Sequence, residues 1–260
     1  MRRPMILTLA LLAAVFTTAG SGVTHAQALR LSELPETEAY RTCIARTQEN
    51  AEAGFEAAIA WRDEGGGPPA LHCVALALFG LGQMDEAAKR LEELADAMPD
   101  ASDAERASVL GQAGTVWLQL RDLDRAHEIL SKSIALDGSS PELWIDRGEA
   151  LARAGEYWDA IDDFSAALDR APNHIDAMIF RAAAYRLLDI DDLARDDIDR
   201  VLDFAPQQPD ALVELGALYA KAGALEDARV VWLEVLSITP DSAAGRAARA
   251  GLEQMDVKVE

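Results

Sequence analysis

Small, aromatic and proline residues recur along this chain at a fixed interval of 34 residues. The clearest column is formed by Ala126, Ala160, Ala194 and Ala228. A fixed period of this length is typical of repeat proteins, in which each unit packs only against its neighbours. The period therefore excludes a fold built around one central core. The other columns are Leu110, Trp144, Met178, Leu212; Gly114, Gly148, Ala182, Gly216; Trp117, Leu151, Tyr185, Tyr219; Leu130, Phe164, Ile198, Trp232; and Gly138, Pro172, Pro206, Pro240.

Each repeating unit has the apolar pattern of two amphipathic helices of about 12 to 15 residues. In residues 141–174 the pattern predicts one helix over Pro141–Ala154 and a second from about Trp158 to Ala171. Pro172 would then stop the second helix, because proline has no N–H and clashes with the preceding turn. Small residues in the alanine and glycine columns would let the two helices approach closely.

The composition agrees with such a packing and excludes several classes of protein. Half of the 260 residues are hydrophobic and only 6% are aromatic, so the apolar content is mostly aliphatic and alanine. This is too apolar for an intrinsically disordered chain. With 45 acidic and 24 basic residues the net charge is -21, which disfavours binding to nucleic acid or anionic lipid.

One unit matches a known family in six positions: Trp144, Gly148, Leu151, Ala160, Phe164 and Pro172. The set resembles the tetratricopeptide repeat (TPR) family, whose pattern is W-x2-L-G-x2-Y followed by Ala, Phe and Pro. The resemblance covers residues 68–240 and implies an all-α fold, a right-handed α-solenoid of helix-turn-helix repeats. It also implies a scaffold that binds a protein or peptide, rather than an enzyme. It does not indicate which partner is bound.

The period divides the chain into segments. An insertion of five residues is expected near residues 100–105, because Ala87 and Ala126 are 39 residues apart. The predicted divisions are a signal peptide over 1–28; a degenerate first helical repeat over 29–67; five TPR repeats over 68–240, at 68–101, 107–140, 141–174, 175–208 and 209–242; and a capping helix and tail over 241–260. Ala53 is the expected counterpart of Ala87 in the first repeat, and Asp241 or Ser242 is expected to cap the last helix.

The first 28 residues have the layout of a secretory signal peptide. Two arginines precede an apolar run from Met5 to Phe16, and a small, polar stretch follows it. Cleavage is expected after Ala26 or Ala28, by a Sec-type route, which predicts a periplasmic or secreted protein. The apolar run is shorter than the roughly 20 residues of a membrane span, so no integral membrane segment is expected after cleavage. Cleavage would change the net charge from -21 to -23, because residues 1–28 contain Arg2, Arg3 and no acid.

Cys43 and Cys73 are the only cysteines. In the repeat register both lie on first helices of consecutive units, and an exported protein folds in an oxidising compartment. We therefore expect a disulfide between them, with two buried free thiols as the alternative. His72 is adjacent to Cys73, but no metal or catalytic motif surrounds it. No metal, cofactor or catalytic residue is predicted.

The first helices are expected to line a concave groove that binds the partner. In an acidic chain, a partly basic and apolar strip along this groove could hold an extended acidic or amphipathic peptide; the alternative is that cations near helix C-termini simply complement the helix dipole. The alternatives to a scaffold are a self-associating structural module and an enzyme with no visible motif. The residues predicted to be exposed in the groove are Leu76, Phe79, Leu118, Ile145, Glu149, Arg153, Ile179, Arg186, Leu187, Val213 and Lys221.

Overall fold

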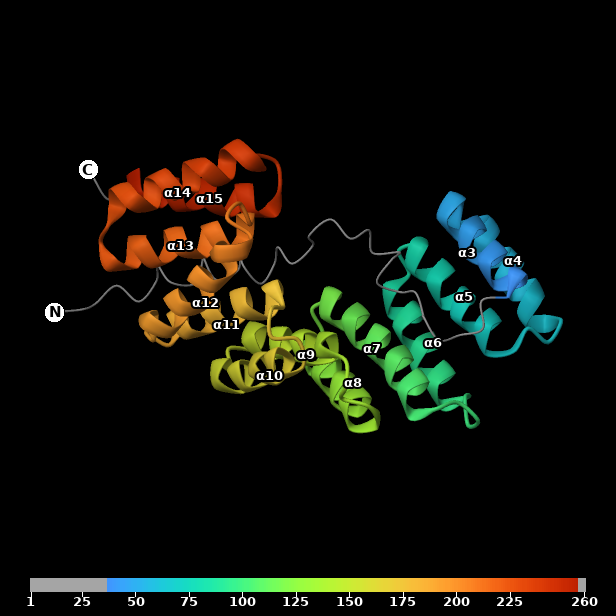
Figure 1. Ribbon diagram of the computed structural model, residues 1–260. Helices are drawn as coiled ribbons and strands as arrows, with labels where there is room; N and C mark the ends of the chain where they lie inside the picture. The colour runs from blue at the N-terminus through green and yellow to red at the C-terminus, as the bar shows by residue number, and fades with distance from the viewer. Residues whose placement is uncertain (1–36, 257–260) are drawn as a thin grey trace. The chain divides into compact units, whose positions relative to one another are not determined.

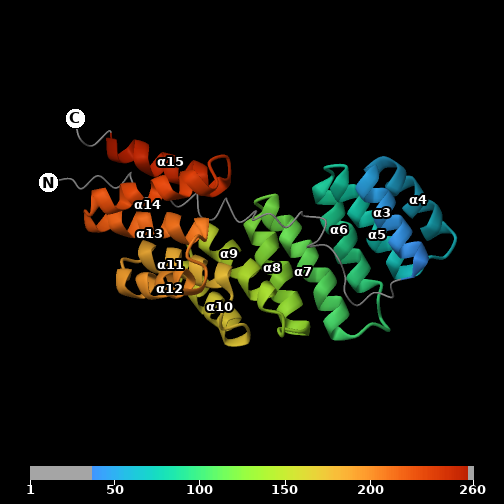
Figure 2. The same ribbon diagram turned by 45° about the horizontal axis from the view of Figure 1, so that its top comes forward.

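The structure is a computed structural model that describes residues 37–256 as thirteen α-helices and no strand (Figures 1 and 2). The expected all-α helical repeat is therefore confirmed for this part of the chain. The predicted signal peptide and its cleavage sites at Ala26 and Ala28 lie outside the described residues, as does the tail from residue 257. The repeat limits and the handedness of the solenoid stay predictions.

The described chain forms two compact units, residues 37–150 and 151–256, and the division falls inside α9 (Pro141–Ala154). In each unit, helices that follow one another in sequence pack side by side. The N-terminal unit contains α3 (Glu38–Glu49), α4 (Ala51–Asp63), α5 (Gly67–Gly80), α6 (Met84–Asp96), α7 (Asp103–Gln119) and α8 (Leu123–Leu136). The C-terminal unit contains α10 (Tyr157–Arg170), α11 (Ile175–Leu187), α12 (Asp191–Phe204), α13 (Pro209–Ala222), α14 (Leu225–Ile238) and α15 (Ala243–Asp256).

The columns of small residues lie where the two helices of a repeat meet. The column alanines from Ala126 to Ala228 are fully buried. At Gly216, an added Cβ would lie 2.3 Å from Nε1 of Trp232, so only glycine lets α13 approach the indole on α14. In the preceding repeat the smaller Ile198 replaces this indole, and Ala182 is accommodated. Column positions on paired helices are thus matched in volume.

Helix ends follow from local side chains. Ser102 and Glu105 form a capping box at the start of α7, with the Ser102 hydroxyl accepting the Glu105 N–H at 3.2 Å. This helix begins four residues before the position equivalent to Pro141, so the predicted insertion mainly lengthens α7 by one turn. At α15, the Ser242 hydroxyl accepts the Gly245 N–H at 3.0 Å, so the cap predicted at Asp241 or Ser242 is Ser242.

The register predicted for the first repeat is wrong by one residue. Ala53 is exposed, whereas Gly54 and Ala58 are the small buried residues of α4. A Cβ at Gly54 would lie 2.6 Å from the Thr47 Cα, which shows how closely α4 crosses α3. The reason is the connection between these helices, which consists of Asn50 alone; its side chain caps α4 by accepting the Ala53 N–H at 2.9 Å.

Candidate interaction surfaces and their supporting contacts

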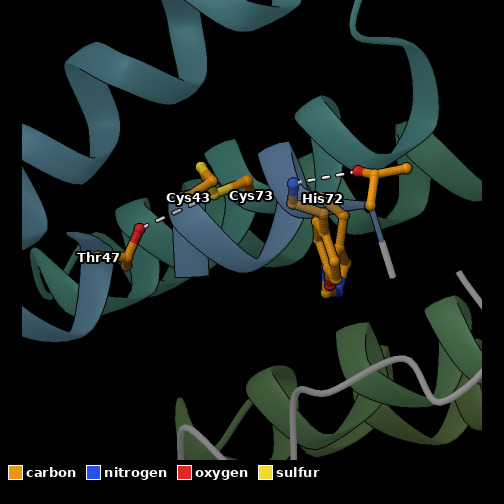
Figure 3. The surroundings of a disulfide bond; sticks show 6 residues. Cys43, Thr47, His72 and Cys73 are labelled. Atoms are coloured by element: carbon orange, nitrogen blue, oxygen red, sulfur yellow. Dashed lines mark hydrogen bonds between the residues drawn. A yellow bond between two sulfur atoms is a disulfide. The ribbon is translucent and has the colours of Figure 1, made fainter. Parts of the chain in front are cut away.

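A disulfide joins Cys43 of α3 to Cys73 of α5 (Figure 3), as predicted from the sequence. The two Cα atoms are 6.4 Å apart, and both side chains are buried. Ala58 of α4 and Leu78 of α5 belong to the same buried cluster. The bond therefore links the first helices of two consecutive repeats within a packed interior.

Next to the disulfide, His72 connects three first helices through its ring (Figure 3). Its Nδ1 lies 2.7 Å from the Tyr40 hydroxyl on α3, and its Nε2 lies 2.8 Å from Oε1 of Gln112 on α7. Since an amide oxygen only accepts, Nε2 carries the proton and Nδ1 accepts from Tyr40. A neutral imidazole in one tautomer thus satisfies both neighbours, and sequence reasoning predicted a packed histidine but not this network.

Burial lowers the pKa of His72 from 6.5 to about 4, although the hydrogen bond to Gln112 opposes the shift. The ring is fully buried, and charging it would place an uncompensated cation in an apolar interior. His72 is therefore neutral at physiological pH and has a structural role.

Acidification is expected to destabilise the N-terminal unit through His72. The unfolded chain binds the proton at about pH 6.5 and the folded chain only at about pH 4, so stability is lost as the pH falls through this window. The loss should reach about 3 kcal/mol at the lower end. Urea unfolding at a series of pH values measures it, and His72→Asn should remove this component of the slope. A His72 ring that titrates near pH 6.5 in NMR spectra of the folded protein would contradict the assignment.

Several predicted groove residues are buried, so their expected exposure is wrong. The first helices contact one another directly, α3 with α5 and α11 with α13, and this packing encloses side chains that spacing alone places on a surface. Leu76, Phe79, Arg153 and Leu187 remain partly accessible, and Lys221 is exposed. The buried members are Leu118, Ile145, Glu149, Ile179, Arg186 and Val213.

Arg186 is not part of an open basic strip. It is only 6% exposed and makes a two-pronged ion pair with Glu214 of α13, at 2.8 Å from Nε and 3.1 Å from Nη2. Burial alone would lower the pKa of Arg186, but the Glu214 carboxylate raises it above the ordinary value. The pair is therefore ionised and joins α11 to α13.

Lys221 at the end of α13 is also paired with acids of its own unit. Its Nζ donates to the Arg186 carbonyl at 2.7 Å and pairs with Asp189 at 2.8 Å and Asp191 at 2.5 Å. The hydrogen bond from Lys221 lowers the pKa of Asp189. Two of the three cations in the predicted strip thus have carboxylate partners, which reduces the strip's attraction for an acidic peptide.

The second helices are less solvated than their acidic sequence indicated. Asp163 and Asp197 were expected on an outer surface, yet each is only 4% exposed. Asp197 receives both branches of the Arg181 guanidinium at 2.8 Å, and Arg181 also donates to Ser165 at 3.0 Å. Arg181 stands where the family pattern has leucine, so an ion pair replaces an apolar contact at this position.

One surface feature was not found from the sequence. A groove of about 640 Å³ lies over α5, between α4 and α6. The residues that line it are Phe55, Ile59, Arg62, Leu71, Val74, Leu78, Gln83, Glu86, Arg90, Glu93, Leu94 and Ala97.

Two further searches concern residues 37–256 only. Within this range no three His, Cys, Asp or Glu side chains are grouped as a metal site would require. No helix in the same range is both long enough and apolar enough to cross a bilayer.

Comparison with known proteins places this architecture. A family model described as tetratricopeptide repeat matches residues 112–175, from the middle of α7 to the start of α11. The chain contains tetratricopeptide repeats. No curated protein sequence matches it significantly.

Solved TPR structures share the fold at low sequence identity. MamA from Desulfovibrio magneticus RS-1 is 17% identical, with a TM-score of 0.55, covering 66% of this chain and 98% of MamA. YrrB, described as a TPR protein with an unusual peptide-binding site, is 17% identical, with a TM-score of 0.52, covering 82% and 98%. The APC/C hetero-tetramer Cut9–Hcn1 is 18% identical, with a TM-score of 0.63, covering 82% of this chain and 42% of that chain. The TPR fold is that of a protein-interaction scaffold.

Proposed function

We propose that this chain is a non-catalytic scaffold that binds a protein or peptide segment in the bacterial cell envelope. The observation that carries the proposal is the stack of helix pairs, because each repeat presents side chains from its first helix on a common face. Such a face is formed before the partner arrives, so the scaffold loses little conformational entropy on binding. YrrB and the Cut9–Hcn1 assembly are, by their descriptions, a peptide-binding and a partner-binding example of the same fold.

The accessible part of the proposed binding face differs between the two units. In the N-terminal unit it contains Leu76 and Phe79 of α5, which are apolar and half-buried. In the C-terminal unit it contains Leu187 and Lys221, with Arg153 at the start of the unit. The buried members of the predicted set would support the face by packing beneath it. Its mixed apolar and basic character suits an amphipathic segment with some acidic residues.

The envelope location is supported by two independent features. The disulfide between Cys43 and Cys73 is of a kind that persists in oxidising compartments and is rare in the cytosol. The layout of residues 1–28 is that of a signal peptide. Expressed as the full chain in a bacterium, the protein should appear in the periplasmic fraction with its N-terminus at Gln27 or Leu29.

The binding face is tested by capture from an envelope extract, with chemical crosslinking and mass spectrometry. Leu187→Asp combined with Lys221→Glu should lose the partners that the wild type captures, because the apolar contact and the cation are both removed. Lys132→Glu, on the second-helix side at α8, is the matched control and should capture the wild-type set. Arg186 stays unchanged, since its loss would disturb folding. Equal capture by the double variant and the wild type would remove the assignment of this face.

A second candidate is self-association, and one observation favours it. Val230 and Leu233 on α14 are 65% and 52% exposed, whereas the equivalent positions on α12 are Asp196 and Asp199. The last second helix thus exposes apolar side chains where the preceding one exposes acids. Light scattering over a range of protein concentrations separates the two candidates, since a constant monomer mass excludes self-association.

A further inference from the structure

We propose that the groove between α4 and α6 binds the phenyl ring of a partner polypeptide. This site lies on the second-helix side of the N-terminal unit. It is therefore separate from the first-helix face and does not depend on it. The inference rests on how the same molecule fills the equivalent grooves of its other repeats.

The floor of the groove comes from one side of α5, where Leu71, Val74 and Leu78 are spaced by three and four residues. Phe55 and Ile59 of α4 form one wall and remain half-buried. The volume of about 640 Å³ is in the range of small-ligand pockets and well above that of one aromatic ring. An apolar surface of this shape is therefore left open to solvent.

The next groove, between α6 and α8, is closed by a ring. Trp117 of α7 occupies the column position of Leu78, and its side chain is buried. Its indole Nε1 donates to Oε1 of Glu92 on α6 at 2.7 Å. Glu92 also pairs with Arg125 of α8, so one ion pair spans the two walls above the indole.

The C-terminal unit repeats this solution. Tyr219 occupies the same column, and the guanidinium of Arg195 on α12 lies 5.3 Å from its ring centre. Tyr185, one repeat earlier, has Arg181 over its ring at 5.9 Å. Arg181 in turn binds Asp197 on α12 and Ser165 on α10, which joins the two walls. An aromatic ring under a cation is thus the usual filling of these grooves.

The groove between α4 and α6 lacks both parts of this filling. Leu78 is smaller than the rings in its column, and no ion pair among the described residues joins α4 to α6. Arg62 pairs with its neighbour Asp63, and Arg90 pairs with two glutamates of its own helix. A ring supplied by another polypeptide would take the place that Trp117 takes in the next repeat.

The chemistry of the walls selects a phenyl ring over an indole. The indole of Trp117 needs the Glu92 carboxylate as acceptor, whereas the α4 wall presents Phe55 and Ile59, which have no polar atom. The carboxylates of the α6 rim are already held by Arg90. A phenyl ring would pack on Phe55 and leave no donor unsatisfied.

The test uses methyl-labelled protein and NMR, with N-acetyl-phenylalanine amide as the probe and N-acetyl-alanine amide as its control. The phenylalanine compound should shift the methyl signals of Ile59, Val74 and Leu78, and the alanine compound should not. No shift at these methyls, or equal shifts with both compounds, overturns the proposal.

Leu78→Trp places a ring of the chain itself in the groove and should weaken the probe about tenfold or more, a change of at least 1.4 kcal/mol. Tyr219→Trp is the matched control, because its groove is already filled, and it should bind as the wild type does. Should Leu78→Trp disturb the circular dichroism spectrum, Ile59→Trp blocks the groove from its half-exposed wall instead. A folded blocking variant that binds the probe with wild-type affinity contradicts the site.

Discussion

Replacing Arg186 by methionine is expected to destabilise the C-terminal unit by about 3–5 kcal/mol, because it leaves a carboxylate buried without its partner. Glu214 is only 1% exposed, and the two hydrogen bonds from Arg186 at 2.8 and 3.1 Å are what compensate for its desolvation. Urea unfolding followed by circular dichroism measures the loss.

Two further variants decide whether the charge or the packing is responsible. Arg186→Met combined with Glu214→Leu removes both charges at similar volume, and its stability should return to near the wild-type value. Lys221→Met breaks an ion pair at the surface of the same unit and should have little effect, since exposed pairs contribute little. If Arg186→Met alone is as stable as the wild type, the buried pair does not hold α11 to α13.

Removal of the disulfide is expected to destabilise the N-terminal repeat by about 3–4 kcal/mol, the value for a 30-residue separation in the chain-entropy estimate. Cys43→Ala combined with Cys73→Ala is the suitable variant, because serine would place two hydroxyls in an apolar interior. Hydrogen exchange followed by mass spectrometry should show faster exchange in α3 and α4.

Residues 151–256 are the internal control for this experiment, since their exchange should be unchanged. Reduction of the wild-type protein should reproduce the effect of the double variant. Unchanged exchange in α3 and α4 after the bond is removed would show that packing around Ala58 and the His72 network is sufficient to hold the first repeat.

Pairs of residues show where sequence spacing is reliable and where it is not. The 34-residue columns predicted that Ala160 and Phe164 are buried, and both have no exposed surface. The same spacing placed Ile179 and Val213 on a groove surface, yet they are 1% and 2% exposed. Periodicity identifies the side of a helix on which a residue lies, but whether that side is covered depends on how closely the next first helix approaches.

Charges show the same limit. The sequence located Arg186 and Lys221 on neighbouring first helices and suggested a basic strip. Only the structure shows that Glu214 and Asp191 neutralise them, because these acids come from different helices and no spacing rule joins them. The contrast between Leu78 and Trp117 was visible in one column, but its meaning needed the positions of α4 and α6.

The sequence by itself determined the helix-pair repeat, the positions of most helices and the pairing of the two cysteines. These features follow from interactions that are local or that recur with the period, so a single chain displays them in its pattern. The tertiary structure alone decided the burial of the first helices, the partners of the buried charges and the open groove of the N-terminal unit. These depend on distances between helices, which are set by the summed volumes of side chains from several repeats at once.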